Sequence, residues 1–154
     1  MIVAPPEQGQ FSEFRFWFLD QVVAPVCISV LANQSIAIQS HQCQLVLRGN
    51  GLGIMLVDLL LLGERPMIVL VDVLMTIEMV DVQSLFSKLE DLRYFLPHYA
   101  HYDLYGMLYG MTVTEPLSRF IMDQGLFLLL EESSERLFRY LNPPEFLPRQ
   151  WNRS

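Results

Sequence analysis

The sequence predicts an α/β fold in which a central mixed β-sheet is flanked by helices, in the order αβββαβ followed by further C-terminal strands. Two nearly continuous apolar runs, 54–62 and 67–75, are joined by a short turn that contains Gly63 and Pro66, and both have the length of buried strands. Segments whose apolar residues repeat with helical spacing stand before and after this pair. With 154 residues, 52% of them hydrophobic, the chain is large enough for one domain with a real core.

The first predicted helix covers residues 11–31, with Ser12 as its cap and Pro25 as a point where it kinks or divides. Its buried stripe is formed by Phe14, Phe18, Val22 and Val26. Alternating apolar and polar residues then predict a half-exposed strand over 35–48, and the turn 48–51 leads into the two apolar strands. Those two strands are expected to form a hairpin at the centre of the sheet.

The second long helix is expected to have Asp81 as its cap and to end near Pro97. Its predicted buried stripe consists of Val82, Leu85, Phe86, Leu89, Leu92, Phe95 and Leu96. A strand is predicted over 103–113, where Gly106 and Gly110 mark points of close approach or a bulge. The remaining expected elements are a short helix opened by Thr114, Glu115 and Pro116 and stopped by Gly125, and strands over 126–130 and 136–141.

We expect a single domain over residues 11–142, preceded by a flexible N-terminus over 1–10 and followed by a C-terminal tail over 143–154. The start of the chain lacks the charged region and the long apolar stretch of a signal peptide. The apolar span 51–77 is broken by two acidic residues and by the turn. Neither half therefore has the roughly 18 to 20 apolar residues of a membrane helix, and we expect no membrane segment.

The charge balance disfavours a polyanionic partner. The chain has 17 acidic residues against 10 basic ones and a net charge of −7, and its basic residues form no run, so DNA binding would need a local basic patch. Cys27 and Cys43 lack the spacing of a zinc site or of a disulfide framework, and both are predicted to be small buried thiols. Such thiols fit a reducing, cytoplasmic setting.

Each of the two apolar runs carries one carboxylate, Asp58 in the first and Asp72 in the second. A carboxylate in a buried strand is costly unless it has a cation, a hydrogen-bond partner or a raised pKa. Oxygen ligands from adjacent strands suit a hard cation such as Mg²⁺. The two acids are therefore the candidate functional site.

The element order and the two acidic strands resemble an uncharacterised family of prokaryotic, notably cyanobacterial, proteins within the PD-(D/E)xK superfamily of restriction-endonuclease-like nucleases. The resemblance extends over about residues 11–151. The segments that carry it, in order, are 18–25, 57–60, 71–73, 81–82, 104–106 with 110–111, 125–127 and 141–149. It implies a restriction-endonuclease-like fold.

The same resemblance implies metal-dependent hydrolysis of DNA phosphodiester bonds. Asp58 and Asp72 would hold Mg²⁺ or Mn²⁺, together with the backbone carbonyl of Val73 and with Asp20 through a water molecule. The metal would offset charge on the scissile phosphate and activate a water for in-line attack, without a covalent intermediate. The resemblance and the apolar composition also imply a homodimer.

Three positions depart from the family pattern. The catalytic lysine is expected two residues after the second acid, on the same strand face, and this position holds Leu74. Leu56 replaces a glutamate that is favoured before the first acid, and Gln21 replaces one of the paired acids on the first helix. Since loss of one charge-stabilising group lowers a rate roughly a hundred- to thousandfold, we expect catalysis, and with it metal binding, to be weakened or lost.

Lys88 and Arg48 are the candidates for a relocated cation. Lys88 lies between Ser87 and the stripe residue Leu89, so we expect a solvated lysine on the outer face of its helix. Arg48, just before the acidic strands, is an equally weak candidate.

Other polar and aromatic groups receive structural interpretations. His98 and His101 have no third ligand in the pattern and are expected in a surface loop, and His41 is expected to face solvent. The run of Glu131, Glu132 and Glu135 is interpreted as a solvated turn. The tyrosines at 94, 99, 102, 105 and 109 are expected to pack in the core or at an interface rather than to stack on bases.

Three functional hypotheses remain open. The protein is a metal-dependent DNA endonuclease with an altered site, or a catalytically silent relative that keeps the fold for binding or self-association, or a sequence that preserves the fold with no selected activity. Leu74 and the acidic net charge favour loss of strong catalysis.

Overall fold

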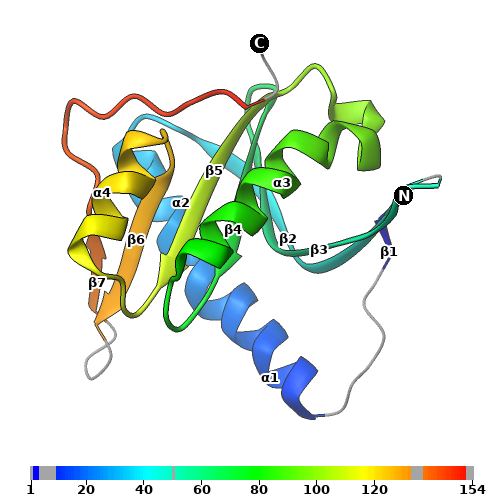
Figure 1. Ribbon diagram of the computed structural model, residues 1–154. Helices are drawn as coiled ribbons and strands as arrows, with labels where there is room; N and C mark the ends of the chain where they lie inside the picture. Colours follow the sequence, from blue (N-terminus) through cyan, green and yellow to red (C-terminus); the bar gives the residue numbers. More distant parts are fainter. Residues whose placement is uncertain (1, 4–9, 50, 133–136, 152–154) are drawn as a thin grey trace.

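The computed structural model describes residues 2–3, 10–49, 51–132 and 137–151 (Figure 1). Six strands, β2 to β7, form one mixed sheet in sequence order, and the two-residue β1 lies at its edge beside β2. The strands are β1 (Ile2–Val3), β2 (Ile38–Gly49), β3 (Gly53–Gly63), β4 (Met67–Val73), β5 (Asp103–Gly110), β6 (Phe127–Glu132) and β7 (Leu137–Tyr140). The predicted α/β fold with a central mixed sheet flanked by helices is confirmed.

Some predictions fall on positions outside the described residues. They are most of the flexible N-terminus (1 and 4–9), Asn50 of the turn 48–51, the end of the chain after Trp151, the first residue of the strand 136–141, and Glu135 of the acidic run. Within the predicted N-terminal segment, Ile2 and Val3 pair with Leu47 and Val46 of β2.

The strand directions follow from the connections. Short turns join β2, β3 and β4, which are antiparallel neighbours, whereas helices connect β4 to β5 and β5 to β6, which are parallel pairs. Parallel neighbours need such crossovers because the chain must return to the same end of the sheet. The last strand, β7, is again antiparallel to its neighbour.

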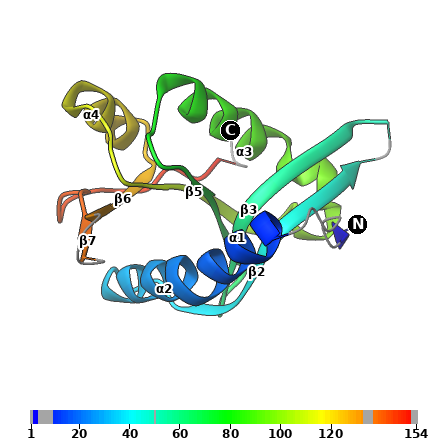
Figure 2. The ribbon, with the colours of Figure 1, turned by 90° about the horizontal axis from the view of Figure 1, so that it is seen from below.

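Helices cover both faces of the sheet (Figure 2). One face, here called the α3 face, carries α3 (Met79–Phe95) and α4 (Glu115–Asp123). The other, the α2 face, carries a continuous helical segment made of α1 (Gln10–Phe18), the π-helical turn η1 (Leu19–Val23) and α2 (Ala24–Asn33). A short 3₁₀ turn, η2 (Pro97–Tyr99), follows α3. Each face has its own hydrophobic core cluster.

All seven residues of β4 are buried, as expected for a central strand. Val69, Val71 and Val73 belong to the core of the α2 face, whereas Ile68 and Leu70 belong to the core of the α3 face. Because side chains alternate along a strand, Asp72 is directed to the α3 face.

This alternation is interrupted in β2 and β3. Cys43 belongs to the core of the α2 face, but Leu45 belongs to that of the α3 face, and Gln44 between them has a φ of 50°. On β3, Val57 and Leu59 likewise belong to opposite cores. In a regular strand both pairs would share a face. The strands therefore rotate at Gln44 and Asp58. As a result, Asp58 does not follow the regular alternation of side chains between the two faces of the sheet.

The first helix is longer than predicted and is not divided at Pro25. It continues to Asn33, and the π-helical turn lies directly ahead of the proline, with Ala24 N–H donating to Leu19 O. A proline in a helix interior normally clashes with the preceding turn. The wider π turn and the position of Pro25 in the first turn of α2 accommodate it.

Two other sequence predictions are corrected. Asp81 is not the cap of α3, because the helix begins at Met79 with Glu78 as N-cap, and Asp81 closes a capping box by accepting from Glu78 N–H at 2.8 Å. Glu131 is not in a solvated turn, because it lies buried in β6 and accepts a hydrogen bond from Tyr109 Oη. The prediction that the tyrosines pack in the core is confirmed for Tyr105 and Tyr109, which are both buried.

Residues 143–151, expected as a tail, pack against both cores: Phe146 contacts the core of the α2 face, and Trp151 belongs to that of the α3 face. Trp151 is buried, stacks on Phe86 at 5.0 Å between ring centroids, and donates its backbone N–H to Leu104 O. Asn142 fixes the start of this segment through hydrogen bonds with Leu128 N–H and Leu126 O.

The segment Glu13–Asn33 is long and apolar enough to cross a membrane by length and composition alone, and 28% of its most apolar window is buried. A helix that covers the core of a soluble domain meets the same two criteria. The prediction of no membrane segment therefore stays a prediction.

Gly106 of β5 provides a test of the packing beneath α3. A Cβ at this position would lie 2.7 Å from both Leu89 Cδ1 and Leu126 Cδ2, which confirms the predicted close approach. We expect Gly106→Val to lower the free energy of unfolding by about 1–3 kcal/mol through overpacking, measured by urea denaturation. The exposed strand variant Gln42→Val is the control, and equal losses in the two variants would contradict this account.

Candidate functional site

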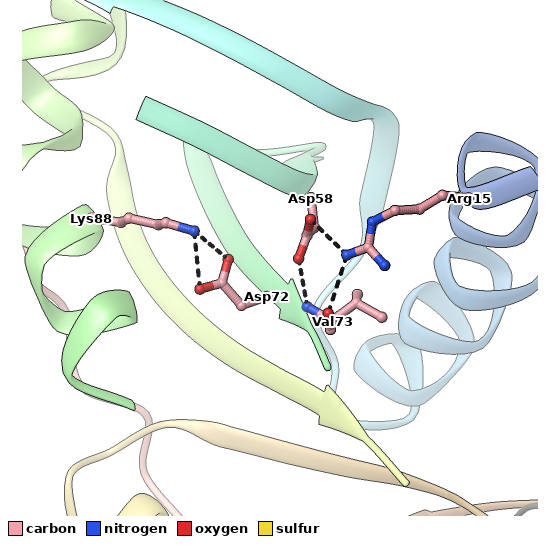
Figure 3. Close-up of polar contacts among 5 residues, drawn as sticks. All are labelled: Arg15, Asp58, Asp72, Val73 and Lys88. Atoms are coloured by element: carbon pink, nitrogen blue, oxygen red, sulfur yellow. Dashed lines mark hydrogen bonds and ion pairs between the residues drawn. The ribbon is translucent and has the colours of Figure 1, made fainter. Parts of the chain in front are cut away.

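The two acid-bearing strands separate at Asp58. The last β3–β4 pair next to it is Leu59 with Val71. Beyond that pair, Val73 N–H donates to Asp58 Oδ2 at 2.9 Å, and Val73 O accepts from Arg15 Nη2 at 3.2 Å (Figure 3). A continued ladder would have satisfied both groups with backbone of β3. Side chains of β3 and α1 replace that backbone.

The Arg15 guanidinium joins the first acid to the second strand. Its Nη2 also donates to Asp58 Oδ1 at 2.9 Å, so one guanidinium nitrogen contacts both Asp58 and the Val73 carbonyl. The Asp58 carboxylate and the Val73 carbonyl are two of the metal ligands predicted from the sequence. A positive charge thus lies where the sequence predicts a metal ion, and such charge-assisted hydrogen bonds are stronger than neutral ones.

Lys88 of α3 holds the second acid. Its Nζ lies 3.1 Å from Asp72 Oδ1 and 3.3 Å from Oδ2, and Asp72 is only 4% exposed (Figure 3). The prediction of a solvated Lys88 on the outer face is wrong. The spacing of Lys88 to Leu85 and Leu92 indicates an inward-facing side chain, because residues three and four apart share one helix face and both leucines are buried.

Burial dominates the electrostatics of Asp72 and raises its pKa from 3.8 to about 6. The ammonium of Lys88 opposes this shift, and the charge of Asp58 reinforces it. Asp58 and Asp72 thus influence each other electrostatically, although each has its own cation on its own side of the sheet.

The remaining predicted residues are placed as follows. Leu74 packs against the core of the α3 face, and Arg48 and Leu56 are exposed on the β2–β3 hairpin. Asp20 hydrogen-bonds His41 of β2 at 2.7 Å. The structure therefore brings Asp58 to the backbone of Val73, whereas Asp72 is held by Lys88 on the α3 face, and the contacts of Asp20 are made with β2 and with its neighbour Gln21.

An open groove of about 620 Å³ lies between the β2–β3 hairpin and α3. Its walls include Leu52, Ile54 and Leu56 from the hairpin and Ser84, Ser87 and Lys88 from the helix. The rotation of the hairpin away from β4 forms this groove. Lys88 lines the groove, whereas its partner Asp72 is buried behind it.

Comparison with known protein families finds no match for this chain, and neither do comparisons with curated proteins and with solved structures.

The raised pKa of Asp72 predicts a pH-dependent stability. Between pH 3.8 and about pH 6, the ordinary and the raised pKa of Asp72, the folded state binds more protons than the unfolded state. The free energy of unfolding therefore falls as the pH rises through this window. The fall should reach about 3 kcal/mol in the wild type and should be missing in Asp72→Asn, as measured by urea denaturation at several pH values. Glu90→Gln, on the exposed side of α3, is the control. If the free energy of unfolding changed with pH in the same way in the wild type and in Asp72→Asn, a raised pKa of Asp72 would be ruled out.

Proposed function

We propose that this protein is a metal-dependent nuclease of the restriction-endonuclease-like PD-(D/E)xK type in which Lys88 replaces the lysine missing at Leu74. The observation that supports the proposal is the contact of Lys88 Nζ with Asp72, next to the strand position where Asp58 meets Val73. The order of helices and strands and the mixed sheet are compatible with that fold.

The residues present suit a hard divalent cation. Asp58, Asp72 and the carbonyl of Val73 offer the oxygen ligands that Mg²⁺ and Mn²⁺ prefer. Because Arg15 and Lys88 hold the two carboxylates on opposite sides of the sheet, the side chains must turn toward each other to share one ion. Asp20 is left out of this set, because His41 and Gln21 engage its two oxygens. When bound, the cation would offset charge on the scissile phosphate and activate water.

Lys88 and Arg15 supply positive charge from the chain itself. Lys88, on the wall of the groove, neutralises Asp72 and can donate to a phosphate oxygen placed there. Arg15 neutralises Asp58, and its side chain is 44% exposed, so it is able to leave when a cation binds. With a net charge of −7, the chain would bind a nucleic acid weakly, because few basic side chains are available to contact phosphates.

A second candidate function is a non-catalytic module for binding or self-association. Arg15 already compensates Asp58, and large apolar side chains are exposed on α1 and on the β2–β3 hairpin. They are Phe14, Phe16, Trp17, Leu52, Ile54 and Leu56. Such surfaces are typical of contacts with another protein or a second copy.

Plasmid nicking with Mg²⁺ or Mn²⁺ tests the nuclease proposal. We expect nicking by the wild type, its loss in Asp72→Asn, and a roughly hundred- to thousandfold decrease in Lys88→Met, because the methionine keeps the length of the stem but removes the charge. Arg119→Met is the matched control, since Arg119 pairs with Glu115 on the exposed side of α4.

The outcomes separate the candidates. Equal nicking by Lys88→Met and the wild type would contradict the role of Lys88. Nicking that requires Leu74→Lys would show a silenced site. An inactive wild type that binds no metal and sediments as a dimer would favour the self-association module.

Arg15 provides a separate prediction for metal affinity. We expect Arg15→Gln to lower the Kd for Mn²⁺ about tenfold in calorimetry, because a charge-assisted hydrogen bond of roughly 1.5 kcal/mol no longer competes with the cation. Arg48→Gln removes a comparable exposed arginine from the hairpin and serves as the control. An unchanged or weaker affinity in Arg15→Gln would show that the guanidinium does not compete for this position.

A further inference from the structure

We propose that Asp20, His41 and Cys43 form a binding site for a transition-metal dication of the zinc class, separate from the acid pair of β3 and β4. The proposal goes beyond the nuclease function and does not depend on it. Within the described parts of the chain, these residues are the group of three or more potential metal ligands whose donor atoms all lie within 4.8 Å of one another.

Two elements build the cluster. His41 and Cys43 are two residues apart on β2 and therefore share its α2 face, while Asp20 reaches them from the π-helical turn that packs over that strand. Asp20 Oδ1 lies 2.7 Å from His41 Nε2. Gln21 Nε2 donates to the other oxygen, Oδ2, at 2.6 Å and so fixes the orientation of the carboxylate.

The donor set selects the class of metal. One carboxylate oxygen, one imidazole nitrogen and one sulfur suit Zn²⁺ and neighbouring transition metals, whereas Mg²⁺ and Ca²⁺ prefer oxygen alone. A carboxylate and a thiolate carry two negative charges, which balance a dication beside a neutral imidazole. The pair of Asp58 and Asp72 offers only oxygens, so the two sites favour different ions.

The degree of burial leaves one coordination position open. Cys43 is 7% exposed and closes the inner side, whereas the side chains of Asp20 and His41 are 28% and 29% exposed. Three protein ligands with a solvent-facing fourth position are typical of zinc sites that bind water or a small ligand. We therefore expect a water as the fourth ligand.

The geometry requires only a small adjustment. Two ligands about 2.0 Å from a tetrahedral zinc ion are roughly 3.3 Å apart, so Asp20 and His41 must separate slightly from their hydrogen-bonded distance. In the metal-free protein, burial and the charge of Asp20 raise the pKa of Cys43 to about 12. A bound dication reverses both effects, because a coordinating thiol loses its proton.

Two uncommon backbone features border the cluster. The π-helical turn Leu19–Val23 carries Asp20, and Gln44, directly after Cys43, has a φ of 50°. π-helical turns and non-glycine residues at positive φ are found preferentially at functional sites. Both features support a ligand site at this place more than an ordinary core contact.

Cobalt(II) titration of the full chain, followed by absorption, tests the proposal because Co²⁺ reports thiolate coordination directly. We expect one Co²⁺ per chain with a thiolate-to-cobalt charge-transfer band that Zn²⁺ abolishes. Cys43→Ala should lose this band, whereas Cys27→Ala should keep it, since Cys27 is the other buried free thiol. Circular dichroism checks that each variant is folded.

Two further variants keep the test decisive. His41→Gln alters a half-exposed residue and should weaken Co²⁺ binding at least tenfold even if Cys43→Ala fails to fold. Asp72→Asn should leave the band unchanged, which separates this site from the proposed nuclease site. The proposal is overturned if the wild type shows no thiolate band, or if His41→Gln binds Co²⁺ as the wild type does.

Discussion

The contact between Asp58 and the backbone of Val73 is the constraint on which the rest of the site depends. It ends the regular pairing of β3 with β4, so that the β2–β3 hairpin turns away from the sheet and a groove forms beside α3. The same opening gives Arg15 access to the free carbonyl of Val73. One half-buried carboxylate thereby lies where the two strands separate, beside the groove that Lys88 lines.

The two acids illustrate how a fold accommodates charge within apolar strands. Asp58 is half-buried and hydrogen-bonded by a backbone N–H as well as by a guanidinium, whereas Asp72 is almost fully buried and has a single ammonium partner. Desolvation outweighs that one partner, which is why the pKa of Asp72 is raised. Asp72 therefore contributes less to the stability of the folded state at neutral pH than it does at acidic pH.

The sequence was sufficient for the α/β class and for the order of helices and strands, but only partly for the site. Periodicity located the central strands and the two crossover helices, because these elements bury whole faces and their patterns are strong. It failed where local geometry departs from ideal periods. The π turn ahead of Pro25 and the rotation at Gln44 have no apolar signature, and they place Asp20 beside His41 and Cys43 and turn Asp58 toward Val73. The sequence neighbours of Lys88, Ser87 and Leu89, do not indicate its direction, whereas its helical spacing to the buried Leu85 and Leu92 does.

The continuous helical segment from α1 to α2 joins the two candidate sites. Arg15 stands five residues before Asp20, with only the end of α1 and the start of η1 between them. The helical segment that carries Asp20 to His41 of β2 also carries the guanidinium that contacts Asp58. One helical segment therefore supplies a side chain to the cluster on β2 and another to the point where β3 and β4 separate.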